Sequence, residues 1–94
     1  MVEFTKVSGR DVGEVRMLAL STCVWCKRTK AFLTDNRIEF SYLDVDLLTR
    51  DDFDEVAAEW SRFNPGLSFP TIVVNSREVI IGYDLNALQR LAGA

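Results

Sequence analysis

Two cysteines, Cys23 and Cys26, are the residues of this chain whose type and spacing most directly suggest chemistry. They are its only cysteines, and two residues separate them in the stretch STCVWCKRTK. Such a pair can cycle between a dithiol and a disulfide, or it can supply part of the ligand set of a zinc or iron–sulfur site. Two randomly placed cysteines would show this spacing about one time in fifty. The surroundings of the pair therefore have to distinguish a redox motif from half of a metal site and from two inert thiols.

The residues just before the pair predict how Cys23 is positioned. The apolar stretch EVRMLAL, residues 14–20, predicts a short buried strand. Ser21 and Thr22 are candidate N-cap residues, and the helical spacing of apolar residues over 26–36 predicts a helix. Cys23 is therefore expected where a strand ends and a helix begins.

This position has an electrostatic consequence for the two thiols. The unsatisfied amide N–H groups and the positive dipole end of a helix start favour a thiolate at Cys23. Cys26 falls one turn further along, within reach of a mixed disulfide on Cys23 but more shielded. Lys27 adds a weaker attraction, because its charge is flexible and hydrated. We therefore assign Cys23 as the nucleophile and Cys26 as the resolving thiol of a redox-active disulfide.

The composition limits the metal alternative. A tetrahedral structural site needs about four ligands, and the chain contains no histidine and no third cysteine. We therefore expect no metal in a single chain. The alternative that remains is a metal- or iron–sulfur-binding module in which Cys23 and an exogenous thiol bridge two chains.

The rest of the chain predicts a small α/β domain. Strands are expected at 38–46, 70–75 and 79–82, the last two joined as a hairpin through NSRE. Two further helices are expected, one capped by Thr49 and ended by FNPG, the other capped by Asp84. A strand–helix–strand start requires a parallel pair, and the closing hairpin is antiparallel. The prediction is a four-stranded mixed sheet flanked by three helices.

Two details complete this prediction. Residues 1–13 form an N-terminal extension in front of a core at 14–92, and their alternating pattern suggests an additional edge strand. The apolar side of the last helix is expected to consist of Leu85, Leu88, Leu91 and Ala92.

Composition and charge exclude several classes of function. Ninety-four residues that are 48% hydrophobic suit one domain spanning 1–94. The net charge is −3, and half of the acidic residues lie between 44 and 59, which argues against a nucleic-acid partner. No apolar run approaches the roughly 20 residues that span a bilayer, and the N-terminus lacks the pattern of a secretory signal. We expect a cytoplasmic monomer with no membrane partner, and in that compartment a lone cysteine pair is more often redox-active or metal-binding than structural.

Three motifs, in order, resemble the glutaredoxins, including the small glutaredoxin-like redoxins that serve ribonucleotide reductase. They are CVWC at the strand–helix junction, SFPT before the third strand and GYD at the start of the last helix. The resemblance covers residues 15–92. It implies a thioredoxin-like fold and a thiol–disulfide oxidoreductase that acts in electron transport and cell redox homeostasis.

The resemblance also implies a substrate groove. Pro70 is expected to follow a cis peptide bond, and the backbone of Phe69 to pair with an extended substrate or glutathione. An ordinary trans proline that starts a strand is the alternative. Gly82 is expected to allow close approach of a backbone, while Tyr83 and Asp84 receive the polar end of the substrate. For Asp84, a role as an N-cap alone is the alternative.

Four residues around the cysteines complete the predicted site. Thr22 and Val24 flank Cys23, and Lys27 contributes charge. Trp25 either presents an exposed ring to a protein partner or packs over the helix. We expect all four to take part in substrate or thiol binding.

The chain departs from the family pattern at three places. Leu20 stands where glutathione-dependent members usually carry a cation, Ile81 replaces one of two glycines, and Val24-Trp25 replaces Pro-Tyr. Without that cation, one charge that would bind the carboxylate of glutathione is missing. We expect no bound cofactor, and substrates that are proteins or small molecules containing a disulfide. Glutathione, another thiol or a thioredoxin reductase is the expected electron donor.

Overall fold

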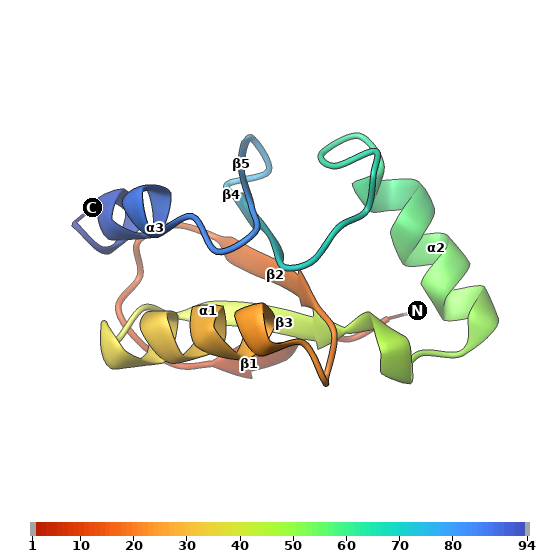
Figure 1. The fold of residues 1–94 in the computed structure, drawn as a ribbon, viewed down its shortest axis with the longest axis horizontal. Helices are drawn as coiled ribbons and strands as arrows, with labels where there is room; N and C mark the ends of the chain where they lie inside the picture. The colour runs from red at the N-terminus through yellow and green to blue at the C-terminus, as the bar shows by residue number, and fades with distance from the viewer. Residues whose placement is uncertain (1, 94) are drawn as a thin grey trace.

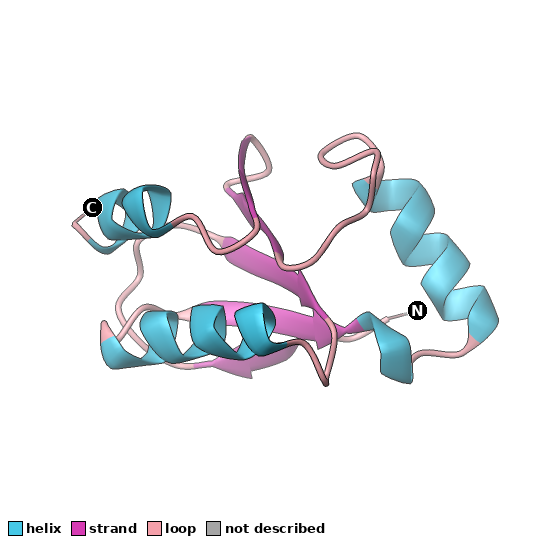
Figure 2. Ribbon diagram, viewed as in Figure 1, coloured by secondary structure: helices cyan, strands magenta, loops and turns pink. Residues whose placement is uncertain are grey.

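The computed structural model of the protein describes residues 2–93. Within this range the chain forms five strands, three α-helices and one short 3-10 helix (Figure 1; Figure 2). In chain order they are β1 (Thr5–Val7), β2 (Val15–Ala19), α1 (Val24–Asp35), β3 (Phe40–Asp44), η1 (Val45–Leu47), α2 (Arg50–Trp60), β4 (Thr71–Val74), β5 (Glu78–Ile81) and α3 (Leu85–Ala92). None of the helices in this range is long and apolar enough to cross a membrane.

The strands form one sheet in the order β1-β3-β2-β4-β5. β2 and β3 are parallel, with Met17 opposite Tyr42. β4 runs antiparallel to β2, and β5 runs antiparallel to β4. β1 pairs antiparallel with β3 and adds a fifth strand at the edge. The predicted mixed sheet and its additional N-terminal strand are therefore confirmed.

Helices cover both faces of the sheet. Since neighbouring residues of a strand point to opposite faces, each strand can contribute side chains to the buried clusters on both sides. Met17 and Ala19 of β2 belong to the buried cluster that includes residues of α1 and α3. Leu18 faces the other way and packs in a second cluster with Val56 and Trp60 of α2. Figure 1 shows the same division, with α2 at one end of the molecule, apart from α1 and α3.

The N-terminal extension is fastened to the core beside β1. A Cβ atom on Gly9 would lie 2.6–2.7 Å from backbone atoms around Ile38, so only glycine permits this close approach. The guanidinium of Arg10 donates hydrogen bonds to the carbonyl oxygens of Asn36 at 3.1 Å and Ala92 at 3.0 Å. Arg10 thereby satisfies carbonyl groups at the C-terminal ends of both α1 and α3.

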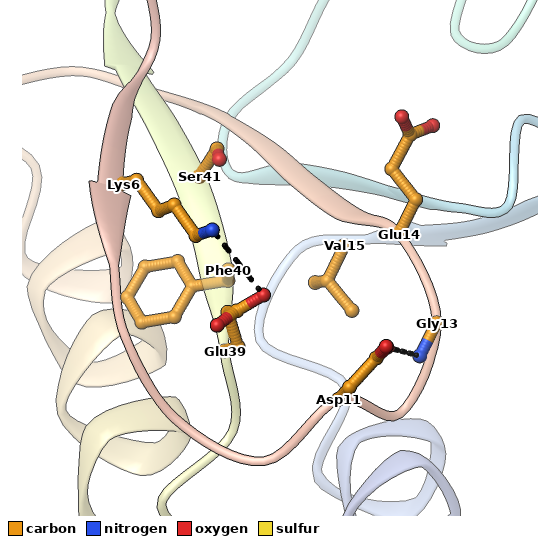
Figure 3. Close-up of a pocket in the computed structure, with 8 residues that line it drawn as sticks. All are labelled: Lys6, Asp11, Gly13, Glu14, Val15, Glu39, Phe40 and Ser41. Carbon is orange, nitrogen blue, oxygen red and sulfur yellow. Dashed lines mark hydrogen bonds and ion pairs between the residues drawn. The ribbon is translucent and has the colours of Figure 1, made fainter.

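A polar pocket of about 490 Å³ lies where β2 and β3 begin (Figure 3). Its carboxylates have partners, since Asp11 accepts a hydrogen bond from the N–H of Gly13 at 2.9 Å and Glu39 forms an ion pair with Lys6 at 3.7 Å. Across residues 2–93, no group of three or more metal-ligating side chains is arranged to hold a metal ion. The pocket lies at the N-terminal end of β2, whereas Cys23 follows the C-terminal end of the same strand. The pocket and the cysteines are therefore at opposite ends of the strand.

Several predicted boundaries are wrong by a few residues. The N-cap of α1 is Cys23 rather than Ser21 or Thr22, so the helix begins at Val24, one or two residues later than predicted. Thr49 caps α2 as predicted, and its hydroxyl accepts a hydrogen bond from the N–H of Asp52 at 3.2 Å.

The ends of two other elements differ from the prediction, and one residue expected in the core of α3 is exposed. α2 ends at Trp60, before FNPG, where the chain turns toward β4. The strand predicted at 38–46 gives way to η1 at its end. In α3, Leu88 and Leu91 are buried as predicted, but Leu85 is 42% exposed because it occupies the first turn, beyond the edge of the core.

Candidate active site

Cys23 is the N-cap of α1. Figure 1 shows the turn that joins this helix to β2. The backbone of Cys23 is extended, with φ −81° and ψ 120°, as an N-cap residue requires. Its Sγ accepts a hydrogen bond from the N–H of Cys26 at 3.2 Å. The sulfur thus takes the place of the capping oxygen of a serine, and a donated N–H stabilises its negative form. Cys23 is partly exposed, so an incoming disulfide can reach it.

Cys26 is fully buried beneath Cys23. Desolvation by burial, together with the hydrogen bond to the Cys23 sulfur, raises the pKa of Cys26 to about 12. The backbone of Leu20 and the charge of Lys30 oppose this rise. Both cysteines are free thiols. The pair therefore combines one accessible sulfur with one that is shielded and protonated near neutral pH.

A carboxylate from η1 holds the turn that carries Cys23. Asp46 accepts two hydrogen bonds from Ser21, one from its hydroxyl and one from its N–H at 2.8 Å. These two bonds, with the hydroxyl contributing more, lower the pKa of Asp46 below its usual range. Although Ser21 is not the N-cap, it fixes the path of the chain two residues before the accessible sulfur.

The second predicted motif, SFPT, packs against the same buried cluster as the cysteines. The Phe69–Pro70 peptide bond is cis, which confirms that feature of the prediction. The N–H of Gly82 donates to the carbonyl of Pro70 at 2.8 Å and ties the two motifs together. On the other side, the buried Asn64 donates through Nδ2 to the hydroxyl of Thr71 at 2.8 Å.

The three predicted motifs meet in a groove of about 200 Å³. It is lined by Trp25, Phe69, Pro70, Gly82 and Tyr83. Gly82 has a left-handed φ of 74°, and a Cβ atom added to it would meet nothing within 4 Å. The groove is therefore open at Gly82, so another backbone has room to approach.

Trp25 forms one wall of this groove while staying exposed. Its ring lies 5.6 Å from that of Tyr83, centroid to centroid, and the guanidinium of Arg28 lies 5.2 Å from it on a cation–π contact. The side chain is nevertheless 53% exposed. The ring therefore packs against Tyr83 and Arg28 and also remains exposed to solvent.

The other predicted residues surround the cysteines less closely. Thr22 and Lys27 are exposed, and Val24 is 62% exposed at the first position of α1. Asp84 acts as the N-cap of α3, because its Oδ1 accepts a hydrogen bond from the N–H of Ala87 at 3.1 Å. The structure therefore brings five of the predicted binding residues into the groove and leaves Thr22, Val24 and Lys27 on the adjoining surface.

Sequence patterns did not point to several residues that support the site. They are Ser21 in its tether to Asp46, Arg28 on Trp25, the ion pair of Lys30 with Asp44, and Asn64 beside Thr71. Local signals were present for two of them, since Lys30 follows Cys26 and Arg28 follows Trp25 by about one helical turn. The contacts of Ser21 with Asp46 and of Lys30 with Asp44 join segments that only the folded sheet brings together.

Comparison with known proteins agrees with these features. The family model described as Glutaredoxin matches residues 3–79. None of the curated protein sequences matches the chain.

Solved structures of similar proteins point to the same family. The glutaredoxin from Methanosarcina mazei Go1 is 42% identical, with a TM-score of 0.87, over 99% of this chain and 90% of that one. Methanosarcina acetivorans methanoredoxin is also 42% identical, with a TM-score of 0.86, over 92% of this chain and 90% of that one. The glutaredoxin from Archaeoglobus fulgidus is 28% identical, with a TM-score of 0.78, over 89% and 90% of the two chains.

The fold of the chain is thus the thioredoxin-like fold of these redoxins, with the Cys-X-X-Cys pair at the start of α1. The extent of the family match and the two structures at 42% identity establish the relationship over nearly the whole chain. The protein belongs to the glutaredoxin family.

Proposed function

We propose that the protein is a thiol–disulfide oxidoreductase that reduces disulfides in proteins or small molecules through a dithiol cycle of Cys23 and Cys26. The observation that carries this proposal is the contrast between the two sulfurs. Cys23 is partly exposed at the tip of a helix, and Cys26 is fully buried one turn away. This contrast assigns a different step to each.

In the first step, the Cys23 thiolate attacks one sulfur of the substrate disulfide. A bond forms between Cys23 and that sulfur, the substrate S–S bond breaks, and the electron pair leaves with the other substrate sulfur, which takes a proton from solvent. The hydrogen bond from the N–H of Cys26 stabilises the thiolate before attack.

In the second step, Cys26 attacks the mixed disulfide at Cys23. The bond between Cys23 and the substrate breaks, the Cys23–Cys26 disulfide forms, and the second substrate sulfur leaves as a thiol. Two electrons have then passed from the cysteine pair to the substrate. A reductant must return them before another turn of the cycle.

The groove suits an extended segment of backbone next to the substrate disulfide. Its volume of about 200 Å³ is smaller than the roughly 300–1,000 Å³ typical of sites that enclose a whole ligand. Among residues 2–93, none forms a hydrogen bond with the N–H or C=O of Phe69. We propose that these two groups pair with the substrate backbone as an added strand does.

The electron donor is part of the same proposal. Leu20, at the position where glutathione-dependent members carry a cation, packs against the apolar cluster of α2. Arg28 supplies a different positive charge, beside Trp25 at the groove. We propose a thiol or a thioredoxin reductase as donor to a cytoplasmic monomer, with glutathione as one of the thiols to be tested.

The proposed function is tested by supplying candidate donors. We expect oxidised protein to regain two free thiols with glutathione, or with a thioredoxin reductase and its nicotinamide cofactor. The donor that succeeds should then drive reduction of a disulfide-containing protein such as insulin faster than it does alone. Absence of acceleration with every donor would contradict the proposal. A coloured, iron-binding dimer that leaves disulfides intact would favour the bridged binding module instead.

A further inference from the structure

The buried thiol presents a difficulty for the second step. Cys26 must act as a thiolate to attack the mixed disulfide, yet desolvation by burial is the main cause that raises its pKa, to about 12 in the reduced protein, and that burial does not depend on the state of Cys23. The chain contains no histidine that could assist near neutral pH. Some feature of the surroundings must therefore favour the negative form of this sulfur during the attack.

One cation is fixed on the same side of α1 as this sulfur. Lys30 follows Cys26 by four residues, a spacing that places Cβ atoms about 5–6 Å apart on a helix. Its Nζ lies 2.9 Å from Oδ1 of Asp44 and 4.0 Å from the ring centroid of Tyr42. The side chains of Lys30 and Asp44 are only 24% and 18% exposed. Lys30 is thus held in place, unlike the exposed Lys27.

Asp44 and Tyr42, which contact Lys30, both belong to β3, and β3 runs beside β2, the strand that leads to Cys23. Asp44 ends β3 and lies opposite Ala19, which ends β2. Ala19 and Cys26 belong to the same buried cluster, and Tyr42 packs against it. The ion pair therefore lies on the face of the sheet that α1 covers, the same face on which Cys26 is buried.

We infer that Lys30, positioned by Asp44 and Tyr42, stabilises the negative charge that develops on Cys26 as it resolves the mixed disulfide. This inference rests on the proposed function. In the step concerned, the proton of Cys26 passes through solvent to the leaving substrate sulfur, while the bond between Cys23 and Cys26 replaces the bond between Cys23 and the substrate. Lys30 gains and loses no proton. It acts as a positioned charge.

The surrounding charges agree with this role. The charged groups that act on Cys26 are Cys23, the N-cap of α1, and Lys30. Lys30 in turn faces Asp44 and Tyr42 of β3, and its charge also acts on Asp46 of η1. Of these, Cys23 disfavours the Cys26 thiolate and Lys30 favours it. The carboxylate of Asp44, 2.9 Å from the ammonium group, fixes the cation and partly offsets its field.

The two steps can be timed separately with dithiobis(nitrobenzoate), a disulfide whose leaving thiolate is coloured. Attack by Cys23 releases the first coloured thiolate at a rate that depends on reagent concentration. Attack by Cys26 releases the second at a rate that does not. The first phase tests the proposed function, and the second tests the inference about Lys30.

In Lys30→Met we expect the second phase to slow about threefold while the first changes little. This expectation assumes that removing the charge lowers the thiolate fraction of Cys26 about tenfold. A sulfur of higher pKa is also more nucleophilic, which offsets about half of the loss on a logarithmic scale and leaves a net decrease of about threefold. Lys30→Arg retains the charge and should restore the rate. Lys6→Met is the matched control, since it removes another ion-paired lysine, at the other end of β3, and should leave both phases unchanged.

A further variant separates the charge of Lys30 from its structural role. Lys30→Met leaves Asp44 without its partner, so Lys30→Met/Asp44→Asn removes both charges and protects against a folding defect. The inference predicts that this double variant also resolves more slowly than wild type at every pH between about 6 and 9. A second phase at the wild-type rate in the double variant would overturn it. A wild-type protein that shows no second phase would instead contradict the proposed function.

Discussion

Cys23→Ser is expected to reduce disulfide turnover to below about one thousandth of the wild-type rate, because a serine hydroxyl is not ionised near neutral pH. Cys26 cannot replace it as the attacking group. It is fully buried, and its pKa of about 12 keeps it protonated. The measurement is the steady-state reduction of insulin with the electron donor that supports the wild type.

The fold of this variant should be intact, which makes the loss interpretable. Cys23 is the N-cap of α1, where its sulfur accepts the N–H of Cys26. Serine is among the preferred N-cap residues and can accept the same bond. We therefore expect unchanged thermal unfolding. Activity within about tenfold of wild type would show that Cys23 is not the nucleophile.

Cys26→Ser is expected to stop the cycle after its first step. Cys23 remains able to attack, so the protein should accumulate a mixed disulfide with one substrate thiol per chain. Release then depends on an external thiol. A well-placed neighbouring group is worth at least about 10⁵ M in effective concentration, far above a millimolar external thiol. Although the protonation of buried Cys26 cancels most of this advantage, turnover of a protein disulfide should still fall at least about a thousandfold.

Intact-protein mass spectrometry detects this trapped species directly. The mass should rise by that of the bound substrate thiol and return to its original value when excess dithiothreitol is added. Cys26→Ala provides the matched control, since it removes the thiol without adding a buried hydroxyl. A variant that turns over protein disulfides as fast as wild type, with no trapped species, would show that resolution does not require Cys26.

The parts of the fold that depend on local pattern could be predicted from the sequence. The alternation and turn chemistry around NSRE predicted the β4–β5 hairpin, and Asn75 and Ser76 indeed take left-handed φ values of 54° and 57°. The polar caps Thr49 and Asp84 were identified because short oxygen-bearing side chains start helices. The strand–helix–strand order then required the parallel pair of β2 and β3.

The N-cap of α1 shows where local preference fails. Ser21 and Thr22 are better intrinsic caps than cysteine, so propensity placed the cap before Cys23. In the folded chain, Ser21 is instead bound to Asp46, a residue 25 positions away. That tertiary contact leaves Cys23 as the residue that meets the first free N–H groups.

The support around the site depends on contacts between distant segments. Lys30 and Asp44 meet only because α1 crosses the sheet above the parallel strands. The cis bond before Pro70 was expected from the family resemblance, since the residues SFPT alone equally suit an ordinary strand start. Such contacts have no local sequence signal, and they are the ones that orient the two sulfurs.

The central claim is that an exposed, reactive sulfur at the helix tip is paired with a buried, protonated one. Brief treatment of the reduced, folded protein with iodoacetamide near neutral pH, followed by peptide mass mapping, tests it most directly. The structure predicts rapid labelling of Cys23 and almost none of Cys26, with Cys26 labelled only after denaturation or as the pH rises toward its pKa of about 12. Equal labelling of the two cysteines, or earlier labelling of Cys26, would contradict this account of the site.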